Sequence, residues 1–474
     1  MTLLLLSLAC RSEPPPTGTV DDTGICDDAL VGDLDVVPLA DHRRAWVQGD
    51  DHEDHLGTAV ACAARSDGLD TPLWVAGGPG LDGGAVIAFE GLGTGELTEA
   101  DARFVLRGDL EERDDVGQTV HIDAEAGWVW AGSPGSFRHE RSAGGIWGVQ
   151  IATAGSEITH GDLDAYVVGD GRGAYAYRGL PLGDLDGDGQ TELMVGHTYW
   201  SALATAEGFL ALYSGDVLDG EVFVDDAAHT FVDPGNINHE GDQLGAADVD
   251  GDGHIDVIHG EPLTEGDGHG RVAIRLGPLL GGSTAKDLQA DIELTGTEGG
   301  VFGTYGSTGD LNGDGAVDLV FADLLAEVDG LDHAGTVYVF FGPFVPGTSI
   351  SADDADLIVE GYAFYGHLAA SVVADHDGDG FDDLIVAHTP EPETDDCAAR
   401  LHVFRGPVPV GRVSALTADL TYAHDEVHTQ LGSALAACDL DGDGDDELVV
   451  GERFYGTDDV PGQGRVHVID GWAF

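Results

Sequence analysis

The sequence predicts an all-β protein built as a seven-bladed β-propeller of four-stranded antiparallel blades, and two observations carry this prediction. The first is an apolar run of Leu, Val, Ile and Ala that recurs seven times, with starts at residues 73, 128, 193, 257, 319, 384 and 448. A nearly constant spacing of this kind is typical of repeat architectures. The second is that each unit contains short β-branched segments separated by turn-forming residues, which predicts a small antiparallel sheet. Seven such sheets arranged radially leave only short, protected edges.

Each unit follows the same internal order. A Gly-containing start leads into a first strand, as at residues 56–61, and an acidic loop or a turn separates it from the apolar run, which is the second strand. A Gly-x-Val-x-Val segment, as at residues 335–341, predicts the third strand, and segments such as residues 290–294 predict the fourth. The units together predict one propeller domain over residues 33–474.

The two ends of the repeat array predict how the ring closes. The seventh unit ends with its third strand, at residues 465–469, and has no outer strand of its own. Residues 45–49 (AWVQG) resemble a fourth strand that has no blade of its own. We expect residues 45–49 to lie on the edge of blade 7, because pairing covers an edge that would otherwise promote aggregation.

Five units carry the same nine-residue acidic loop directly before the apolar run. Oxygen-bearing side chains stand at positions 1, 3, 5 and 9, and glycines stand at positions 4 and 6. Ca²⁺ takes about six to eight oxygen ligands, and the glycines let the backbone turn so that the position-7 carbonyl can face inward. The pattern therefore predicts about five structural calcium ions. The predicted ligands are Asp184, Asp186, Asp188, Gln190 and Glu192; Asp248, Asp250, Asp252, His254 and Asp256; Asp310, Asn312, Asp314, Ala316 and Asp318; Asp375, Asp377, Asp379, Phe381 and Asp383; and Asp439, Asp441, Asp443, Asp445 and Glu447.

With these loops, the chain resembles the FG-GAP repeats of integrin alpha-subunit propellers and of many secreted bacterial proteins. Two further features support the resemblance. Units start with Leu-Gly or Phe-Gly, as at Phe302 and Gly303, and apolar runs end in Gly-x-Pro, as at residues 77–79. The resemblance implies that each acidic loop joins strands 1 and 2 of a blade and holds Ca²⁺. Units 1 and 2 depart from the pattern: Ala64 and Ser66 replace the first ligands of unit 1, and unit 2 has a shortened turn. We assign these two units no metal.

The N-terminal segment is typical of a targeting signal. Residues 1–10 form an apolar run that ends in Ala-Cys, and residues 11–32 are a Pro-, Gly- and Asp-rich linker. The segment resembles a bacterial lipoprotein signal with Cys10 as the acylated residue, and it is too short to span a membrane. The alternative is a truncated or misannotated start, because the segment lacks basic residues before the run. We expect an extracytoplasmic protein that is lipid-anchored to the cell envelope or secreted, and a monomer.

Charge excludes one class of partner. The formal net charge is −69, with 88 Asp and Glu against 19 Lys and Arg. Nucleic acid must be met by a basic surface, so the composition argues against nucleic-acid binding. No catalytic constellation stands out, and the sequence favours a binding or adhesion module for protein or glycan partners. The alternative is a hydrolase or lyase that acts on polysaccharides, because some relatives with such repeats are enzymes.

One position in the repeat predicts a partner site. Four residues after each apolar run starts, units 3–7 carry an ionisable side chain: His197, Glu261, Asp323, His388 and Glu452. A five-residue strand spans roughly 16 Å, so we expect these side chains to emerge around the central channel, on the face opposite the calcium loops. The alternative is ordinary polarity at strand ends.

Two pairs of cysteines are candidates for disulfide bonds. Cys26 and Cys397 lie in predicted loops and could pair in an oxidising compartment. Cys62 and Cys438 lie on the innermost strands of units 1 and 7, which are neighbours in a closed ring. A disulfide and a pair of buried small apolar side chains both fit this second pair.

Overall fold

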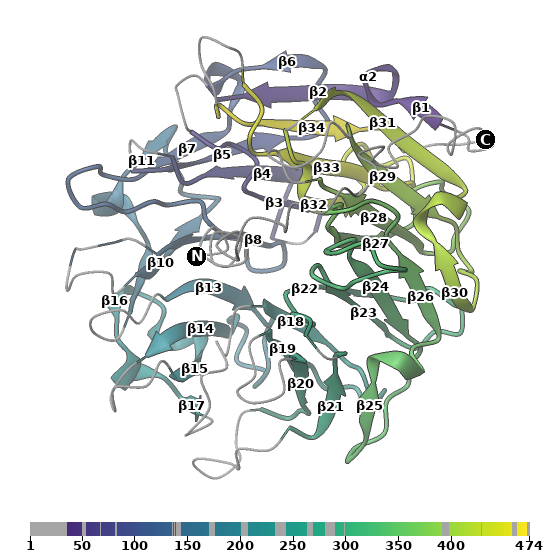
Figure 1. Cartoon of the computed structure of the whole chain (residues 1–474). Coiled ribbons are helices and arrows are strands. Elements are labelled where there is room, and N and C mark those ends of the chain that lie inside the picture. Colours follow the sequence, from purple (N-terminus) through teal and green to yellow (C-terminus); the bar gives the residue numbers. More distant parts are fainter. Residues whose placement is uncertain are drawn as a thin grey trace, which may run out of the picture.

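The computed structural model is a seven-bladed β-propeller with a radial arrangement of small sheets (Figure 1). It describes residues 36–49, 54–66, 68–80, 83–134, 136, 138, 144–169, 176–200, 207–232, 243–262, 269–279, 290–297, 299–390, 398–427, 429–456 and 462–471. The predicted signal segment, the linker, Cys10, Cys26 and Cys397 lie outside these residues. The predicted fold class is confirmed.

Each blade contains four antiparallel strands, numbered here from the channel outward. Blade 1 holds β3 (Ala59–Ala63), β4 (Leu73–Gly78), β5 (Ala85–Glu90) and β7 (Phe104–Arg107), and blade 2 holds β8 (Val120–Asp123), β9 (Trp128–Ser133), β10 (Gly145–Gln150) and β12 (Ala165–Val168). Blade 3 holds β13 (Ala176–Pro181), β14 (Leu193–Trp200), β15 (Glu207–Tyr213) and β17 (His229–Val232), and blade 4 holds β18 (Gln243–Ala247), β19 (Asp256–Glu261), β20 (Arg271–Arg275) and β21 (Ile292–Thr295). Blade 5 holds β22 (Tyr305–Gly309), β23 (Asp318–Asp323), β24 (Thr336–Phe340) and β26 (Leu357–Glu360), and blade 6 holds β27 (Leu368–Ala374), β28 (Asp383–His388), β29 (Ala398–Phe404) and β31 (Leu420–Val427). Blade 7 holds β32 (Leu431–Cys438), β33 (Glu447–Glu452), β34 (Arg465–Ile469) and β2 (Arg43–Gln48).

Six sheets have a fifth strand that the four-stranded prediction missed. These short strands pair in parallel with the outermost strand of the blade: β11 (Glu157–Ile158), β16 (Gly220–Val222), β25 (Ser349–Ser351), β30 (Gly411–Ser414), β1 (Val36–Pro38) and β6 (Gly95–Leu97). Each one comes from the segment that precedes the fourth strand of the next blade along the ring. The physical reason is that the outermost strand would otherwise expose a row of unpaired N–H and C=O groups.

Helical structure is minor in the described residues. The one α-helix described is α2 (Leu39–His42), which is four residues long. The 3₁₀ turns are η2 (Glu99–Asp101), η3 (His160–Asp162), η4 (Gly215–Val217), η5 (Val224–Asp226), η6 (Ala352–Asp354) and η7 (Ala415–Thr417). No helix within the described ranges is long and apolar enough to cross a membrane.

The ring closes between segments from opposite ends of the chain. Strand β2 pairs antiparallel with β34, so that Trp46 lies opposite His467 and Val47 lies opposite Val466. The described β2 covers residues 43–48, whereas the sequence placed the closing strand at residues 45–49. The outer edge of β2 is paired in turn with β6, which comes from the chain segment between the third and fourth strands of blade 1.

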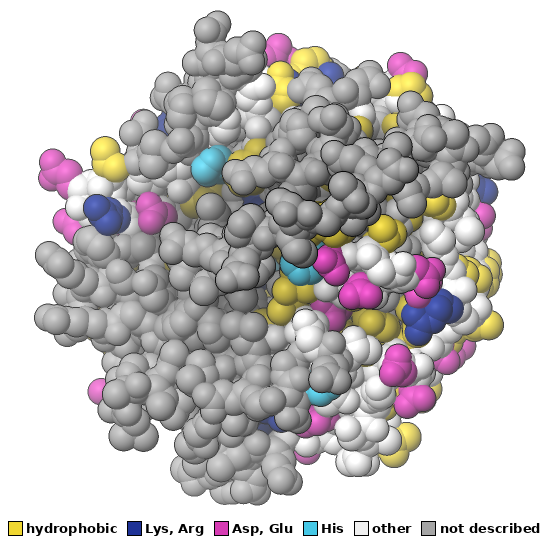
Figure 2. All heavy atoms as spheres, viewed as in Figure 1, with side chains coloured by type: hydrophobic (Ala, Val, Ile, Leu, Met, Phe, Trp, Pro, Cys, Tyr) yellow, Lys and Arg dark blue, Asp and Glu magenta, His cyan; other side chains and the backbone are white. Residues whose placement is uncertain are grey.

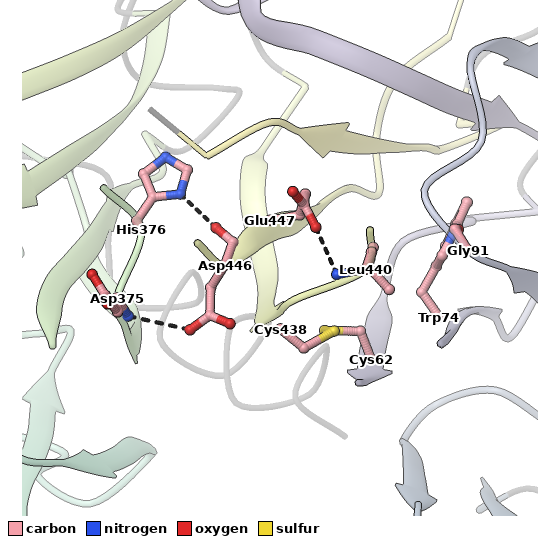
Figure 3. The surroundings of a disulfide bond; sticks show 9 residues. All are labelled: Cys62, Trp74, Gly91, Asp375, His376, Cys438, Leu440, Asp446 and Glu447. Atoms are coloured by element: carbon pink, nitrogen blue, oxygen red, sulfur yellow. Dashed lines mark hydrogen bonds between the residues drawn. A yellow bond between two sulfur atoms is a disulfide. The ribbon is translucent and has the colours of Figure 1, made fainter. Parts of the chain in front are cut away.

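A disulfide bond joins the same two blades at their inner strands. It links Cys62 of β3 to Cys438 of β32, across 376 residues of sequence and with Cα atoms 6.1 Å apart (Figure 3). Of the two alternatives for this pair, the structure therefore has the disulfide.

The core lies between the blades. Every residue of β4, β19, β23, β28 and β33 is buried, because each second strand is covered on both faces by neighbouring sheets. This two-sided burial explains why the second strands read as continuous apolar runs rather than as alternating patterns.

Candidate functional site

The five acidic loops all join the first strand of a blade to the second, in blades 3–7. They therefore lie at the same end of their blades and on one face of the ring.

The first carboxylate of each loop organises the turn. In the loop at residues 248–256, Asp248 accepts hydrogen bonds from the N–H groups of Gly251, Asp252 and Gly253, at 2.9, 3.0 and 2.9 Å. The backbone φ values of Gly251 and Gly253 are 76° and 91°. Side chains with a Cβ rarely adopt such values, which explains the glycines at positions 4 and 6.

The next two carboxylates turn toward the same centre. Asp250 accepts the N–H of Asp252 at 3.1 Å, and Asp252 accepts the N–H of His254 at 2.9 Å. The same bonds recur around Asp186 and Asp188. In several loops three carboxylate oxygens lie within 4.8 Å of one another, as in the clusters Asp184, Asp186 and Glu192; Asp248, Asp250 and Asp256; Asp375, Asp377 and Asp379; and Asp439, Asp441 and Glu447.

The position-9 acid anchors the loop to the rest of its blade. Asp256 is buried and accepts the N–H of Val249 at 2.8 Å and that of Gly277, beyond β20, at 2.7 Å. Burial raises the pKa of Asp256, and it raises the pKa of Asp318 to about 6, of Asp383 to about 7 and of Glu447 to about 8. Neighbouring carboxylates of the same loop raise these pKa values further.

This donor set fits a hard cation. Oxygen ligands suit Ca²⁺ and Mg²⁺, whereas imidazole and thiolate favour transition metals. Two buried position-9 oxygens, Oδ2 of Asp383 and Oε1 of Glu447, have no hydrogen-bond partner among the described residues. Oε2 of Glu447 accepts the N–H of Leu440 (Figure 3). A buried carboxylate oxygen without a partner is costly unless a cation balances it.

The loop at residues 310–318 differs at position 3. Asn312 takes the place of an aspartate, and its Nδ2 donates to Asp314 Oδ2 at 3.1 Å. At positions 1, 3, 5 and 9 this loop therefore has three carboxylates, whereas each of the other loops has four. By this charge count we expect it to be the loop with the weakest calcium binding.

Adjacent loops are linked by a residue that the sequence analysis did not single out. Position 8 is aspartate only in the loops of blades 6 and 7. Asp382 accepts the N–H of Asp310 in the blade 5 loop at 2.8 Å, and Asp446 accepts the N–H of Asp375 in the blade 6 loop at 3.2 Å (Figure 3). The sequence shows an aspartate at position 8 of these two loops. Only the arrangement of the blades in the ring shows which neighbouring loop it contacts.

The corresponding turns of blades 1 and 2 are built differently. Ser66 donates its hydroxyl hydrogen bond to the carbonyl of Ala124 in the next blade. Asp123 accepts the N–H groups of Glu125 and Ala126 at 3.1 and 3.0 Å. These are ordinary contacts of a tight turn.

The predicted ring of partner-binding side chains does not reach the surface. The exposed fractions of His197, Glu261, Asp323, His388 and Glu452 are all between 0 and 1%. The expectation that they emerge around the channel is therefore wrong. The physical reason is that the end of each second strand remains packed between neighbouring sheets.

The two histidines and Glu261 of this set are engaged within the blades. His197 stacks on Phe209 with ring centroids 4.1 Å apart, and His388 stacks on Tyr362 at 4.6 Å. Burial lowers the pKa of His197 to about 3 and that of His388 well below its usual value, so both are neutral between pH 5 and 8. Glu261 forms a bidentate ion pair with Arg271, at 2.6 and 3.0 Å.

Glu452 joins two histidines in a buried cluster. His424 Nε2 lies 2.6 Å from Oε1 of Glu452, and His467 Nε2 lies 2.8 Å from Oε2. Two imidazoles and a carboxylate could hold a transition metal. However, Arg43 lies 3.4 Å from His467 Nδ1 and can only donate, which leaves the proton of the neutral ring on Nε2, facing the carboxylate. The geometry therefore fits a hydrogen-bonded link between blades 6 and 7 better than a metal site.

The charge balance of the chain is visible on its surface. Figure 2 shows more Asp and Glu than Lys and Arg side chains on the described part of one face. This is the distribution that a net charge of −69 implies. A surface of this kind repels acidic polymers.

Comparison with known proteins places one blade in a repeat family. The family model of the FG-GAP repeat matches residues 431–469, which run from β32 to the end of β34. The chain is also 30% identical over 164 residues to the phosphatidylinositol-glycan-specific phospholipases D of Homo sapiens and Bos taurus, and 34% identical over 152 residues to that of Rattus norvegicus.

These alignments cover 34, 34 and 30% of this chain but only 19, 19 and 18% of the relatives, so the chain spans about a fifth of their length. The repeat match and the architecture agree with each other. The chain is thus a β-propeller similar to those of integrin alpha subunits, and its seventh blade matches the FG-GAP repeat.

Proposed function

We propose that this chain is an extracytoplasmic, calcium-stabilised β-propeller that serves as a binding or adhesion module for a protein or glycan partner. The observation that carries the proposal is the convergence of carboxylate oxygens in the loops of one face of the ring. FG-GAP domains are typically extracellular. A disulfide between Cys62 and Cys438 suits the oxidising conditions found outside the cytoplasm.

Calcium has a structural role in this proposal. The side chains at positions 1, 3, 5 and 9 bind the ion, and the backbone N–H groups of the loop hold those carboxylates in place. The ion supplies the positive charge that lets several carboxylates lie within 4.8 Å of one another. Extracellular modules of this type bind calcium with dissociation constants of roughly 10⁻⁴–10⁻³ M.

The partner binds on the face opposite the calcium loops. The five buried side chains at the ends of the second strands are not its contacts, because their exposed fractions do not exceed 1%. Connections at that end of the blades, such as the segment between β23 and β24, supply the surface. A net charge of −69 favours a cationic, hydroxyl-rich or metal-bridged partner over an acidic one.

An enzyme is the competing class, and the partial similarity to phospholipases D is the observation that favours it. Their names describe the cleavage of phosphatidylinositol-glycan, but the chain spans only about a fifth of their length. Sequence similarity of this extent supports a shared module rather than a shared activity.

A screen on glycan and protein arrays at saturating calcium tests the binding function. The parent protein should bind a defined partner, and chelator should abolish the signal as the loops lose their ions. The double variant Asp248→Asn with Asp252→Asn serves as the matched probe of one loop. Hydrolysis of a polysaccharide or of phosphatidylinositol-glycan, without any stable partner, would instead support the enzyme.

A further inference from the structure

A small cavity lies between blades 5, 6 and 7 and belongs to none of the calcium loops. It encloses about 60 Å³ and is bordered by the starts of β22, β27 and β32 and by the residues that follow β23, β28 and β33. The acidic loops join the opposite ends of these strands. The cavity therefore opens toward the face opposite the calcium loops.

One wall of the cavity carries a buried cation, Arg453. Arg453 is 6% exposed, and its Nε donates a hydrogen bond to Gln430 Oε1 at 2.7 Å. The guanidinium also lies 4.9 Å from the ring centroid of Phe454. Among the described residues no carboxylate pairs with Arg453. Burial lowers the pKa of Arg453 without neutralising the group at pH 7.

This lack of a partner is unusual for the chain. Acidic residues outnumber Lys and Arg by 88 to 19, and the neighbouring Glu452 is committed to His424 and His467. A buried charge without a counter-ion is unfavourable. The outer nitrogens of the guanidinium make no hydrogen bond within the described part of the chain.

A second polar group lines the same cavity without a partner. His367 is 5% exposed, and its Nε2 is buried with no hydrogen bond among the described residues. The backbone N–H of His367 donates to the carbonyl of His333 at 3.1 Å, and the rings of the two histidines stack with centroids 6.0 Å apart. Burial lowers the pKa of His367 to about 4, which leaves a neutral imidazole at pH 7.

The remaining walls are mostly apolar. Val301, Leu324, Leu325, Ala369 and Ala370 line the cavity, with Tyr305 beside them. One cation and one neutral imidazole in such a setting match a single negative charge on an apolar body. The guanidinium binds carboxylates through two parallel hydrogen bonds. A volume of 60 Å³ admits several non-hydrogen atoms but is small beside the roughly 300–1,000 Å³ of ordinary ligand pockets.

We propose that this cavity is a binding site for a small monocarboxylate with a short apolar chain, with Arg453 as the counter-ion and His367 as a second polar contact. The site goes beyond the calcium and partner-binding functions. It places a ligand at the junction of three blades, on the proposed partner face.

Calorimetric titration of the full chain with sodium butyrate, in saturating calcium at pH 7, tests the proposal. Butan-1-ol, which keeps the chain length but has no charge, and inorganic phosphate, which has no apolar chain, are the matched ligands. Butyrate should bind one site per chain, at least tenfold more tightly than either. Equal binding of butan-1-ol, stronger binding of phosphate, or no saturable butyrate binding would overturn the proposal.

Variants test whether butyrate binds in this cavity and beside Arg453. Arg453→Gln should weaken butyrate binding at least tenfold, whereas Arg412→Gln, which removes an arginine on the exposed edge of blade 5, should leave it unchanged. Ala369→Leu, which keeps the charge and fills the cavity, should weaken binding by a similar factor. If Arg453→Gln does not fold, the ligand series and Ala369→Leu decide the question. Full butyrate affinity in folded Arg453→Gln or Ala369→Leu would contradict the assignment.

Discussion

At the scale of single residues, burial sets the charge of the ionisable side chains at the ends of the second strands. Burial opposes ionisation of Glu452, but hydrogen bonds from His424 and His467 outweigh it and hold the pKa of Glu452 well below its usual range. Asp323 has no such cationic partner in the described structure, and burial raises its pKa to about 6 although the N–H groups of Val301 and Leu325 bind it. Asp323 and Glu452, which match in the repeat, therefore ionise at different pH.

Asp323 is expected to make stability depend on pH. The pKa of Asp323 is about 6 in the folded protein, above the reference value of 3.8. The folded state therefore binds this proton more tightly than the unfolded chain does. The contribution of Asp323 to the free energy of unfolding is fully present below pH 3.8 and is lost as pH rises through about 6. Asp323→Asn should remove this dependence and raise the free energy of unfolding above pH 6 by up to about 3 kcal/mol. Chemical denaturation at several pH values, at constant calcium, measures the difference from the parent. The exposed Asp354→Asn is the control, and identical pH profiles for parent and Asp323→Asn would contradict the prediction.

At the scale of elements, strand edges govern how the blades are completed. The connection that precedes each fourth strand supplies a parallel strand to the previous blade in six of the seven described sheets. The same rule places β1 on blade 6 and β2 on blade 7, although both come from the N-terminal part of the chain. A short segment of the chain thus completes two blades.

Removal of β2 is expected to destabilise the ring. Ala45 and Val47 are buried, and β2 covers the edge of β34. A protein that starts at residue 50 should lose about 1.5–3 kcal/mol of stability from Val47 alone and should self-associate through the exposed edge. A protein that starts at residue 36 keeps both strands and is the control. Thermal unfolding and light scattering compare the two, and a monomeric shorter protein with an unchanged midpoint would argue against closure by β2.

At the scale of the whole molecule, contacts between the acidic loops and a disulfide connect neighbouring blades of the ring. Asp382 links the loops of blades 5 and 6, and Asp446 links those of blades 6 and 7. Blades 1 and 7 are joined by β2 and by the Cys62–Cys438 bond. The disulfide lies beside the blade 7 loop, because Cys438 directly precedes Asp439 (Figure 3).

We predict five bound calcium ions and a strong effect of chelation. At 10 mM calcium, each loop should add roughly 1–3 kcal/mol for dissociation constants of about 10⁻⁴–10⁻³ M, because ions bind only the folded state. Metal analysis should find five ions in the parent and four in the Asp248→Asn, Asp252→Asn double variant. Fewer than four ions in the parent, or a melting temperature indifferent to chelator, would refute the prediction.

Reduction of the disulfide should also lower stability. A bond across 376 residues restricts the unfolded chain, and native disulfides typically contribute about 2–4 kcal/mol. Reductant should therefore lower the melting temperature of the parent at saturating calcium. The Cys62→Ala, Cys438→Ala double variant should melt lower than the oxidised parent and should not respond to reductant. Equal melting temperatures for the oxidised and reduced parent would contradict a stabilising bond.

The sequence alone determined the features that repeat at short range. Seven apolar runs predicted seven blades, since a strand buried on both faces must be apolar along its length. The acidic loops were recognisable because all their side-chain oxygens lie within nine residues. In both cases the physical constraint acts on residues close together in the chain.

Only the tertiary structure decided the features that depend on distant segments. The parallel fifth strands come from the next blade, and the choice of a disulfide for Cys62 and Cys438 depends on how blades 1 and 7 meet. Glu261 and Asp323 look like surface charges in the sequence, yet neighbouring sheets bury them. Arg453 acquires its place in an apolar cavity from three separate blades. Burial is set by what packs around a residue, and no local pattern of the chain carries that information.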